Sequence, residues 1–113
     1  MRQVGVLAAA GLVALEKMTE RLAEDHVNAK LIADALASVP GISVDLAGVQ
    51  TNIVILKLTG ARSAIDVVAG LKRRGILCGN VGVDIVRLVT HHDLDRSQCK
   101  HAAEQIAAEL AIA

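Results

Sequence analysis

The sequence predicts an α+β fold: a small sandwich of a short, largely antiparallel sheet covered by helices, preceded by a long apolar helix. Three observations support this. Residues 1–38 carry apolar side chains at helical spacing. Residues 42–58 and 76–90 contain short apolar runs that alternate as strands do, and helix-start signals precede residues 64 and 96. We therefore expect one small domain over residues 1–113, helical over 1–38 and α+β over 42–113.

The N-terminal third predicts two helices. The first runs from about Gln3 to Met18 and carries no charge between Gln3 and Leu15, so we expect it to be buried on several sides. Thr19 is the expected N-cap of the second helix, which Pro40-Gly41 ends after about Ser38. Its apolar face comprises Leu22, Ala29, Ile32, Ala33 and Leu36.

Two strands and a third helix are expected next. The strands span Ile42–Leu46 and Asn52–Leu58. Ser63, with Asp66 three residues later, resembles a capping box that starts the helix. Gly75 ends this helix, whose predicted apolar face consists of Ile65, Val68 and Leu71.

The last part of the chain predicts a strand pair and a final helix. The strands span Ile76–Cys78 and Asp84–Thr90, joined by a turn at residues 79–82. Asp95 and Gln98 form the next helix-start signal. The apolar stripe of this helix consists of Cys99, Ala102, Ala103, Ile106 and Leu110.

Composition excludes several functions. The chain has 12 basic and 12 acidic residues and no aromatic residue, which argues against a nucleic-acid partner. Its uncharged segment is shorter than the roughly 20 residues that span a bilayer, so we expect no membrane partner. Cys78 and Cys99 form neither a disulfide framework nor a zinc motif, and we interpret them as buried thiols of a cytoplasmic protein.

Arg87 is the strongest candidate for a binding residue. It interrupts one apolar face of the predicted 84–90 strand, where a guanidinium lies either at a solvent edge or beside an anionic partner. Its planar fork can bind both oxygens of a carboxylate. His91, His92 and Asp93 lack the spacing of a metal site, so we predict no metal. The glycines likewise match no phosphate-loop pattern.

Four blocks of sequence, in order, carry a family resemblance. They are Met1–Gly11, Leu22–Ala29, Val49–Val54 and Arg87–His91. In these blocks the chain resembles the C-terminal part of the low-specificity L-threonine aldolases. The resemblance implies an aspartate-aminotransferase type of fold, pyridoxal phosphate as cofactor, and cleavage of β-hydroxy-α-amino acids to glycine and an aldehyde.

The resemblance also implies roles for two arginines. Arg87 matches the arginine that holds the substrate carboxylate, and Arg2 matches an arginine near the cofactor phosphate, which it could reach across a subunit interface. The family's Schiff-base lysine belongs upstream of Met1–Gln3, and no lysine of this chain has a matching context. We therefore expect the complete enzyme to be a lyase and the isolated chain to be inactive.

Two other interpretations remain open at this stage. The chain could be a free-standing α+β module that binds an amino acid, or an oligomerisation domain. The apolar first helix separates the free-standing module from an enzyme fragment, because a self-sufficient module would not normally expose such a helix. In an oligomerisation domain this helix would form the interface. We expect a homo-oligomer, or a protein completed by an N-terminal part that covers this helix.

Overall fold

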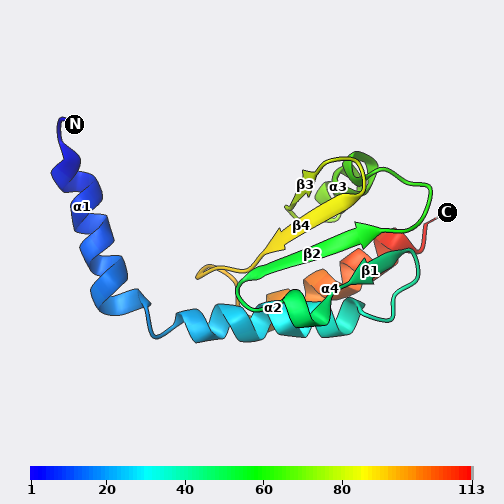
Figure 1. Ribbon diagram of the computed structural model, residues 1–113, viewed down its shortest axis with the longest axis horizontal. Coiled ribbons are helices and arrows are strands. Elements are labelled where there is room, and N and C mark those ends of the chain that lie inside the picture. Colours follow the sequence, from blue (N-terminus) through cyan, green and yellow to red (C-terminus); the bar gives the residue numbers. More distant parts are fainter. Residues whose placement is uncertain (113) are drawn as a thin grey trace.

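The computed structural model describes residues 1–112, which form four α-helices and a four-stranded sheet. Figure 1 shows their arrangement. The elements, in chain order, are α1 (Val4–Val13), the π-helical turn η1 (Ala14–Met18), α2 (Leu22–Leu36), β1 (Ile42–Val44), the 3-10 turn η2 (Leu46–Gly48), β2 (Ile53–Leu58), α3 (Ala64–Arg73), β3 (Gly79–Val81), β4 (Ile85–Val89) and α4 (Arg96–Leu110).

The sheet has the strand order β1-β2-β4-β3, and every neighbouring pair is antiparallel. Its centre is the β2–β4 pair, in which Ile53 lies opposite Val89 and Ile55 lies opposite Arg87. Gly79 of β3 lies on the other side of Arg87. The α+β class and the antiparallel sheet predicted from the sequence are confirmed.

Helices cover only one face of this sheet. Side chains alternate along each strand, and the buried ones, Val54 and Leu56 of β2 with Val86 of β4, point toward the helices. The opposite face stays open. The buried apolar core is completed mainly by Ala29, Ile32, Ala33, Leu36, Leu58, Ala64, Val67, Leu71, Leu88, Cys99 and Ile106.

Two helix starts agree with the sequence. The Ser63 hydroxyl accepts a hydrogen bond from the Asp66 amide at 3.2 Å. Asp95 and Gln98 form a complete capping box, in which each side chain accepts from the other residue's main-chain amide at 2.8–2.9 Å. These local bonds satisfy amide groups that a helix start leaves unpaired, which is why they could be predicted from spacing alone.

The first helix differs from expectation. The α-helical part spans ten residues, a π-helical turn follows it, and neither contains a buried residue. Figure 1 shows α1 extending away from the sheet and the other helices, which gives the chain a longest dimension of 50 Å. The expectation of burial on several sides is therefore wrong for a single chain. Within residues 1–112, no helix combines the length and apolar character needed to cross a bilayer.

Three boundary predictions also need correction. Thr19 does not cap α2: the helix starts at Leu22 after Arg21, which makes no side-chain cap bond. The predicted 76–78 strand lies instead at Gly79–Val81. The turn shifts with it, to Gly82, whose positive φ of 74° suits glycine. The strand therefore lies where residues 79–81 pair with β4, and not at the more apolar residues 76–78.

Two apolar faces were also partly misassigned. In α3, Ile65 is 63% exposed, while Ala64 and Val67 are buried in its place. In α2, Leu22 is exposed, whereas the other four predicted positions are buried. Both errors fall in the first turn of a helix. There, a small error in the predicted first residue changes which side chains are expected to face the core.

A buried ion-pair cluster joins α3, α4 and the loop after β2. The Glu109 side chain is only 4% exposed, and its two carboxylate oxygens accept from Arg62 at 2.6 Å and from Arg74 at 2.9 Å. Arg62 also donates to the Glu109 carbonyl at 2.8 Å. Gly70 of α3 makes room for this carboxylate, because a Cβ there would lie 1.9 Å from Glu109 Oε1. The cluster holds the end of α4 on α3.

We predict that Glu109→Gln destabilises the fold by about 1–3 kcal/mol, because it removes charge-assisted hydrogen bonds from a buried site. Hydrogen bonds from Arg74 and Arg62 lower the pKa of Glu109 below its ordinary 4.5. A lowered folded-state pKa means that this stabilisation is present above pH 4.5 and disappears as pH falls through the folded-state value.

Urea unfolding of the parent chain and the variant, from neutral to acidic pH, measures this contribution. The difference between the two should shrink as the solution becomes acidic. Glu104→Gln, on the exposed side of α4, is the matched control and should change little. A Glu109→Gln loss no larger than that of Glu104→Gln would contradict the prediction.

Candidate functional site

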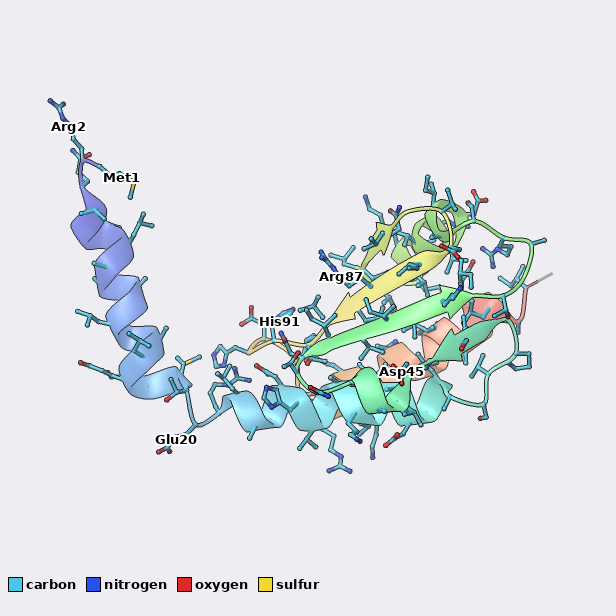
Figure 2. All side chains as sticks on the ribbon, viewed as in Figure 1. Met1, Arg2, Glu20, Asp45, Arg87 and His91 are labelled. Atoms are coloured by element: carbon cyan, nitrogen blue, oxygen red, sulfur yellow. The ribbon has the colours of Figure 1, made fainter. Side chains whose placement is uncertain are left out.

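Arg87 lies in the middle of β4 on the open face of the sheet. The neighbouring Val86 and Leu88 point into the core, so the alternation of the strand directs the Arg87 side chain outward. Figure 2 shows this side chain projecting from the sheet. Within residues 1–112, no carboxylate lies within ion-pair distance of its guanidinium.

The surroundings of Arg87 on this face are mostly apolar. Ile53, Ile55, Val81 and Val89 are 42–48% exposed, and they come from the strands on either side and from β4 itself. Gly79, directly opposite Arg87 on β3, adds no side chain. An arginine on a partly apolar surface retains strong hydrogen-bonding capacity for a planar anion, because few competing groups surround it.

The end of β4 beyond Arg87 is fixed by a group of polar contacts. The Thr90 amide donates to the Asn52 carbonyl at 2.9 Å, and the Asn52 side-chain amide donates to the Thr90 carbonyl at 2.8 Å. The Thr90 hydroxyl donates to the Asp25 carbonyl of α2 at 2.7 Å. These three contacts join β4, the start of β2 and α2 at one point.

Asp25 connects this point to the segment between η1 and α2. Its carboxylate is nearly buried and forms a two-pronged ion pair with Arg21, four residues earlier. Hydrogen bonding and attraction from Asp25 raise the pKa of Arg21 above its ordinary value. The positive charge of Arg21 thus compensates the negative charge of Asp25, which would otherwise be buried without a partner.

Arg2 lies far from Arg87. It precedes α1 at the end of the chain that extends away from the sheet, and Figure 2 shows Arg2 at the free tip of α1 and Arg87 on the sheet, well apart from it. Within one chain the structure therefore does not bring the two predicted site residues together.

The residues that follow β4 line a groove but make no metal site. His91 Nδ1 accepts from the Asp93 amide at 3.3 Å, and both side chains are exposed. They border a cavity of about 750 Å³ between residues 75–77 and α4, and Arg87 does not line it. Within residues 1–112, no group of three His, Cys, Asp or Glu side chains could hold a metal ion.

The two thiols fit a structural role. Cys99 is buried and Cys78 is half-buried. Burial raises the pKa of both thiols, and the nearby negative charges of Asp95 and Asp25 add to this effect at Cys99. A raised pKa leaves the thiol protonated, whereas a nucleophilic cysteine needs the thiolate.

Sequence reasoning missed the contacts that hold the site. The pairing of Arg21 with Asp25 had a usable signal, because residues four apart on a helix are neighbours. Asn52 and Thr90 had none, since 38 residues separate them and only the β2–β4 register brings them together.

The chain is similar in sequence to known proteins. A family model described as beta-eliminating lyase matches residues 1–59. The low-specificity L-threonine aldolase 1 of Arabidopsis thaliana is 39% identical over 99 residues, which are 86% of this chain and 28% of that protein. The low specificity L-threonine aldolase of Escherichia coli strain K12 is 38% identical over 111 residues, 98% of this chain and 32% of that protein. The chain thus spans about a third of the length of these relatives.

Solved structures share the fold. The cystine C-S lyase C-DES, in complex with its product cysteine persulfide, gives a TM-score of 0.73 at 18% identity, over 91% of this chain and 28% of that one. The 8-amino-7-oxononanoate synthase of Francisella tularensis gives 0.69 at 20% identity, over 95% and 32%. At these identities the likeness concerns the fold alone. The family model, however, covers just over half of the 113 residues, so the chain belongs to the beta-eliminating lyase family.

Proposed function

We propose that this chain is the C-terminal part of a threonine-aldolase-like lyase, which cleaves β-hydroxy-α-amino acids to glycine and an aldehyde. In this proposal Arg87 binds the substrate carboxylate. The observation that carries it is an arginine without a carboxylate partner within residues 1–112, on the open and largely apolar face of the sheet. The relatives named low-specificity L-threonine aldolase support the reaction class.

The relatives also imply pyridoxal phosphate, and the described residues fit this group in part. Arg87 would hold the substrate carboxylate, and Arg2 is the candidate for the cofactor phosphate. The five lysines (Lys17, Lys30, Lys57, Lys72 and Lys100) are all exposed. None of them lies on the open sheet face beside Arg87 except Lys57, which faces the same way two residues from Ile55. Because the family resemblance gives none of these five lysines the context of the Schiff-base lysine, we propose that the covalent anchor is not among them.

In this proposal Arg87 orients the bound substrate. Bound pyridoxal phosphate supplies an electron sink for the carbon–carbon cleavage. Two parallel hydrogen bonds from the guanidinium fix the plane of the substrate carboxylate, and thereby the direction of the bond that breaks. Once a second chain or domain covers this face, the apolar side chains around Arg87 would help to exclude water and would strengthen this ion pair.

Because Arg2 and Arg87 lie apart within one chain, their use in a single site requires a second copy or a rearranged α1. The exposed apolar surface of α1 favours the first alternative. An assembly in which α1 of one protomer is covered by another would bury this surface and would also carry Arg2 to the partner. A pure oligomerisation module remains the second candidate function, and the same surface favours it.

We predict that Arg87 determines substrate binding in a chimera in which residues 1–113 replace the matching third of the E. coli relative. Arg87→Lys keeps the charge but loses the fork, so catalytic efficiency toward L-threonine should fall. Arg87→Ala should lose more, about 2–5 kcal/mol in transition-state stabilisation, because a paired, desolvated charge is truncated. Steady-state kinetics beside cofactor titration measure both effects.

Cofactor affinity should stay unchanged in both variants, because the phosphate is held elsewhere. Arg73→Ala, at an exposed basic position near the end of α3, is the matched control and should leave the kinetics unaltered. Near-normal kinetics of Arg87→Ala would remove Arg87 from the site.

We predict that the 113-residue chain by itself binds pyridoxal phosphate weakly and without a covalent bond, because none of its lysines has the family's context. Absorbance spectra should show no stoichiometric cofactor–lysine adduct, and mass spectrometry after borohydride reduction should find no single modified lysine. The intact E. coli relative serves as positive control. One specifically modified lysine, together with release of glycine from threonine, would overturn the proposal that the anchor lies elsewhere.

We predict that the chain self-associates through α1. Static light scattering should show a dimer or a larger oligomer at high concentration, and Leu7→Glu combined with Leu12→Glu should shift it toward monomer. Ile65→Glu combined with Leu77→Glu, which adds the same two charges at exposed positions outside α1, is the control. A parent chain that stays monomeric at high concentration would argue against association.

A further inference from the structure

We propose that Asn52 and Thr90 are positioning residues for Arg87: they fix the end of β4, so that the guanidinium is presented at a defined place on the open sheet face. This inference rests on the proposed function of Arg87. It concerns residues to which the proposed function gives no contact with substrate or cofactor, and it is carried by hydrogen bonds at the point where β2, β4 and α2 meet.

The β2–β4 pair ends at Asn52 and Thr90. In an antiparallel sheet, a hydrogen-bonded pair exchanges two main-chain bonds. The register that places Ile53 opposite Val89 places Asn52 opposite Thr90, one residue beyond the strands. One of the two bonds is the usual main-chain bond, from the Thr90 amide to Asn52. The other comes from the Asn52 side-chain amide, which takes the place of a main-chain donor. Asn52 thus extends the hydrogen bonding between β2 and β4 by one residue pair, where the chain enters β2 from a turn.

The Thr90 hydroxyl makes a further contact at this point, with α2. Thr90 is 2% exposed and donates to the Asp25 carbonyl, 65 residues away in sequence. Asp25 is itself buried and held by Arg21. A buried hydrogen bond of this kind is costly to leave unmade. The end of β4 is therefore tied to the helical layer as well as to its neighbouring strand.

Arg87 lies between two points at which hydrogen bonds hold the ends of β4. Before it, the Leu58 amide donates to the Asp84 carbonyl at 2.7 Å and closes the start of β4. After it, Thr90 lies three residues further along the strand, or about 10 Å at the usual rise. No ion pair within residues 1–112 holds the guanidinium itself. Its placement therefore depends on the backbone of β4, and catalytic groups tolerate displacements of only about 0.5 Å.

A structural role alone and a positioning role lead to different kinetics. If Thr90 only stabilises the fold, its loss lowers the amount of folded protein and affects all functions alike. If it acts through Arg87, its loss weakens substrate binding, leaves cofactor affinity intact, and has no further effect once Arg87 is gone. A double-mutant cycle separates the two, because residues that act through one another are not additive.

The experiment compares Thr90→Val, which keeps the shape but removes the donor, with Thr90→Ser, which keeps the hydroxyl. In the chimera described above, Thr90→Val should raise KM for L-threonine about tenfold or more, as expected for a displaced binding group. Thr90→Ser should restore it to within about twofold of the parent, and cofactor affinity should be equal in all three. Thr59→Val, at an exposed threonine just after β2, is the matched control.

The cycle adds Arg87→Ala to Thr90→Val. We expect the double variant to match Arg87→Ala alone. Additive losses, or an unchanged KM in Thr90→Val, would overturn the positioning role while leaving Arg87 as the carboxylate group. If Arg87→Ala itself has no effect, the proposed function fails first, and this proposal fails with it.

A measurement on the 113-residue chain tests the anchor without catalysis. Amide hydrogen exchange followed by NMR should show that the main-chain amide of residue 90 exchanges at least tenfold faster in Asn52→Ala and in Thr90→Val than in the parent. Exchange should change little in Thr59→Val. Unaltered protection at residue 90 in both variants would refute the anchor, whatever the behaviour of the chimera.

Discussion

The alternation of side chains along β4 is the constraint on which the rest of this structure depends. Val86 and Leu88 must reach the helical layer, since they are among the least exposed residues of the chain. With a period of two, Arg87 then has to point the other way. A shift of one residue against β2 would bury the guanidinium and expose the core. The same apolar residues that stabilise the sheet therefore determine where the candidate binding group lies.

This one-sided arrangement is maintained by polar contacts as much as by apolar ones. A core without aromatic residues offers only small and medium side chains to hold three helices on a sheet. Glu109 connects α4 to Arg74 at the end of α3 and to the loop of Arg62, and Gly70 allows the close approach of the two helices. At the other end of the molecule, Thr90 connects β4 to α2. The two groups of contacts hold opposite ends of the helical layer.

The sequence predicted features that depend on neighbours along the chain. Capping at Ser63 and Asp95 and the two faces of β4 are of this kind, and the structure agrees with all of them. Thr19 and the 76–78 strand were wrong because their outcome depends on where the chain turns and which register the sheet adopts. The contacts around Thr90 and Glu109 could not be predicted, since each joins residues 35 or more positions apart.

The two surfaces left without a partner in this chain are also the two that the proposed function uses. The open sheet face carries Arg87 among exposed apolar side chains, and α1 exposes every one of its residues. Exposed apolar area on this scale favours association, because burying it removes hydrocarbon from contact with water. A lyase site assembled between chains or domains would bury both surfaces at once. In the described residues the core lies on the helical side of the sheet, and under the proposed function another chain or domain would cover the side where Arg87 lies.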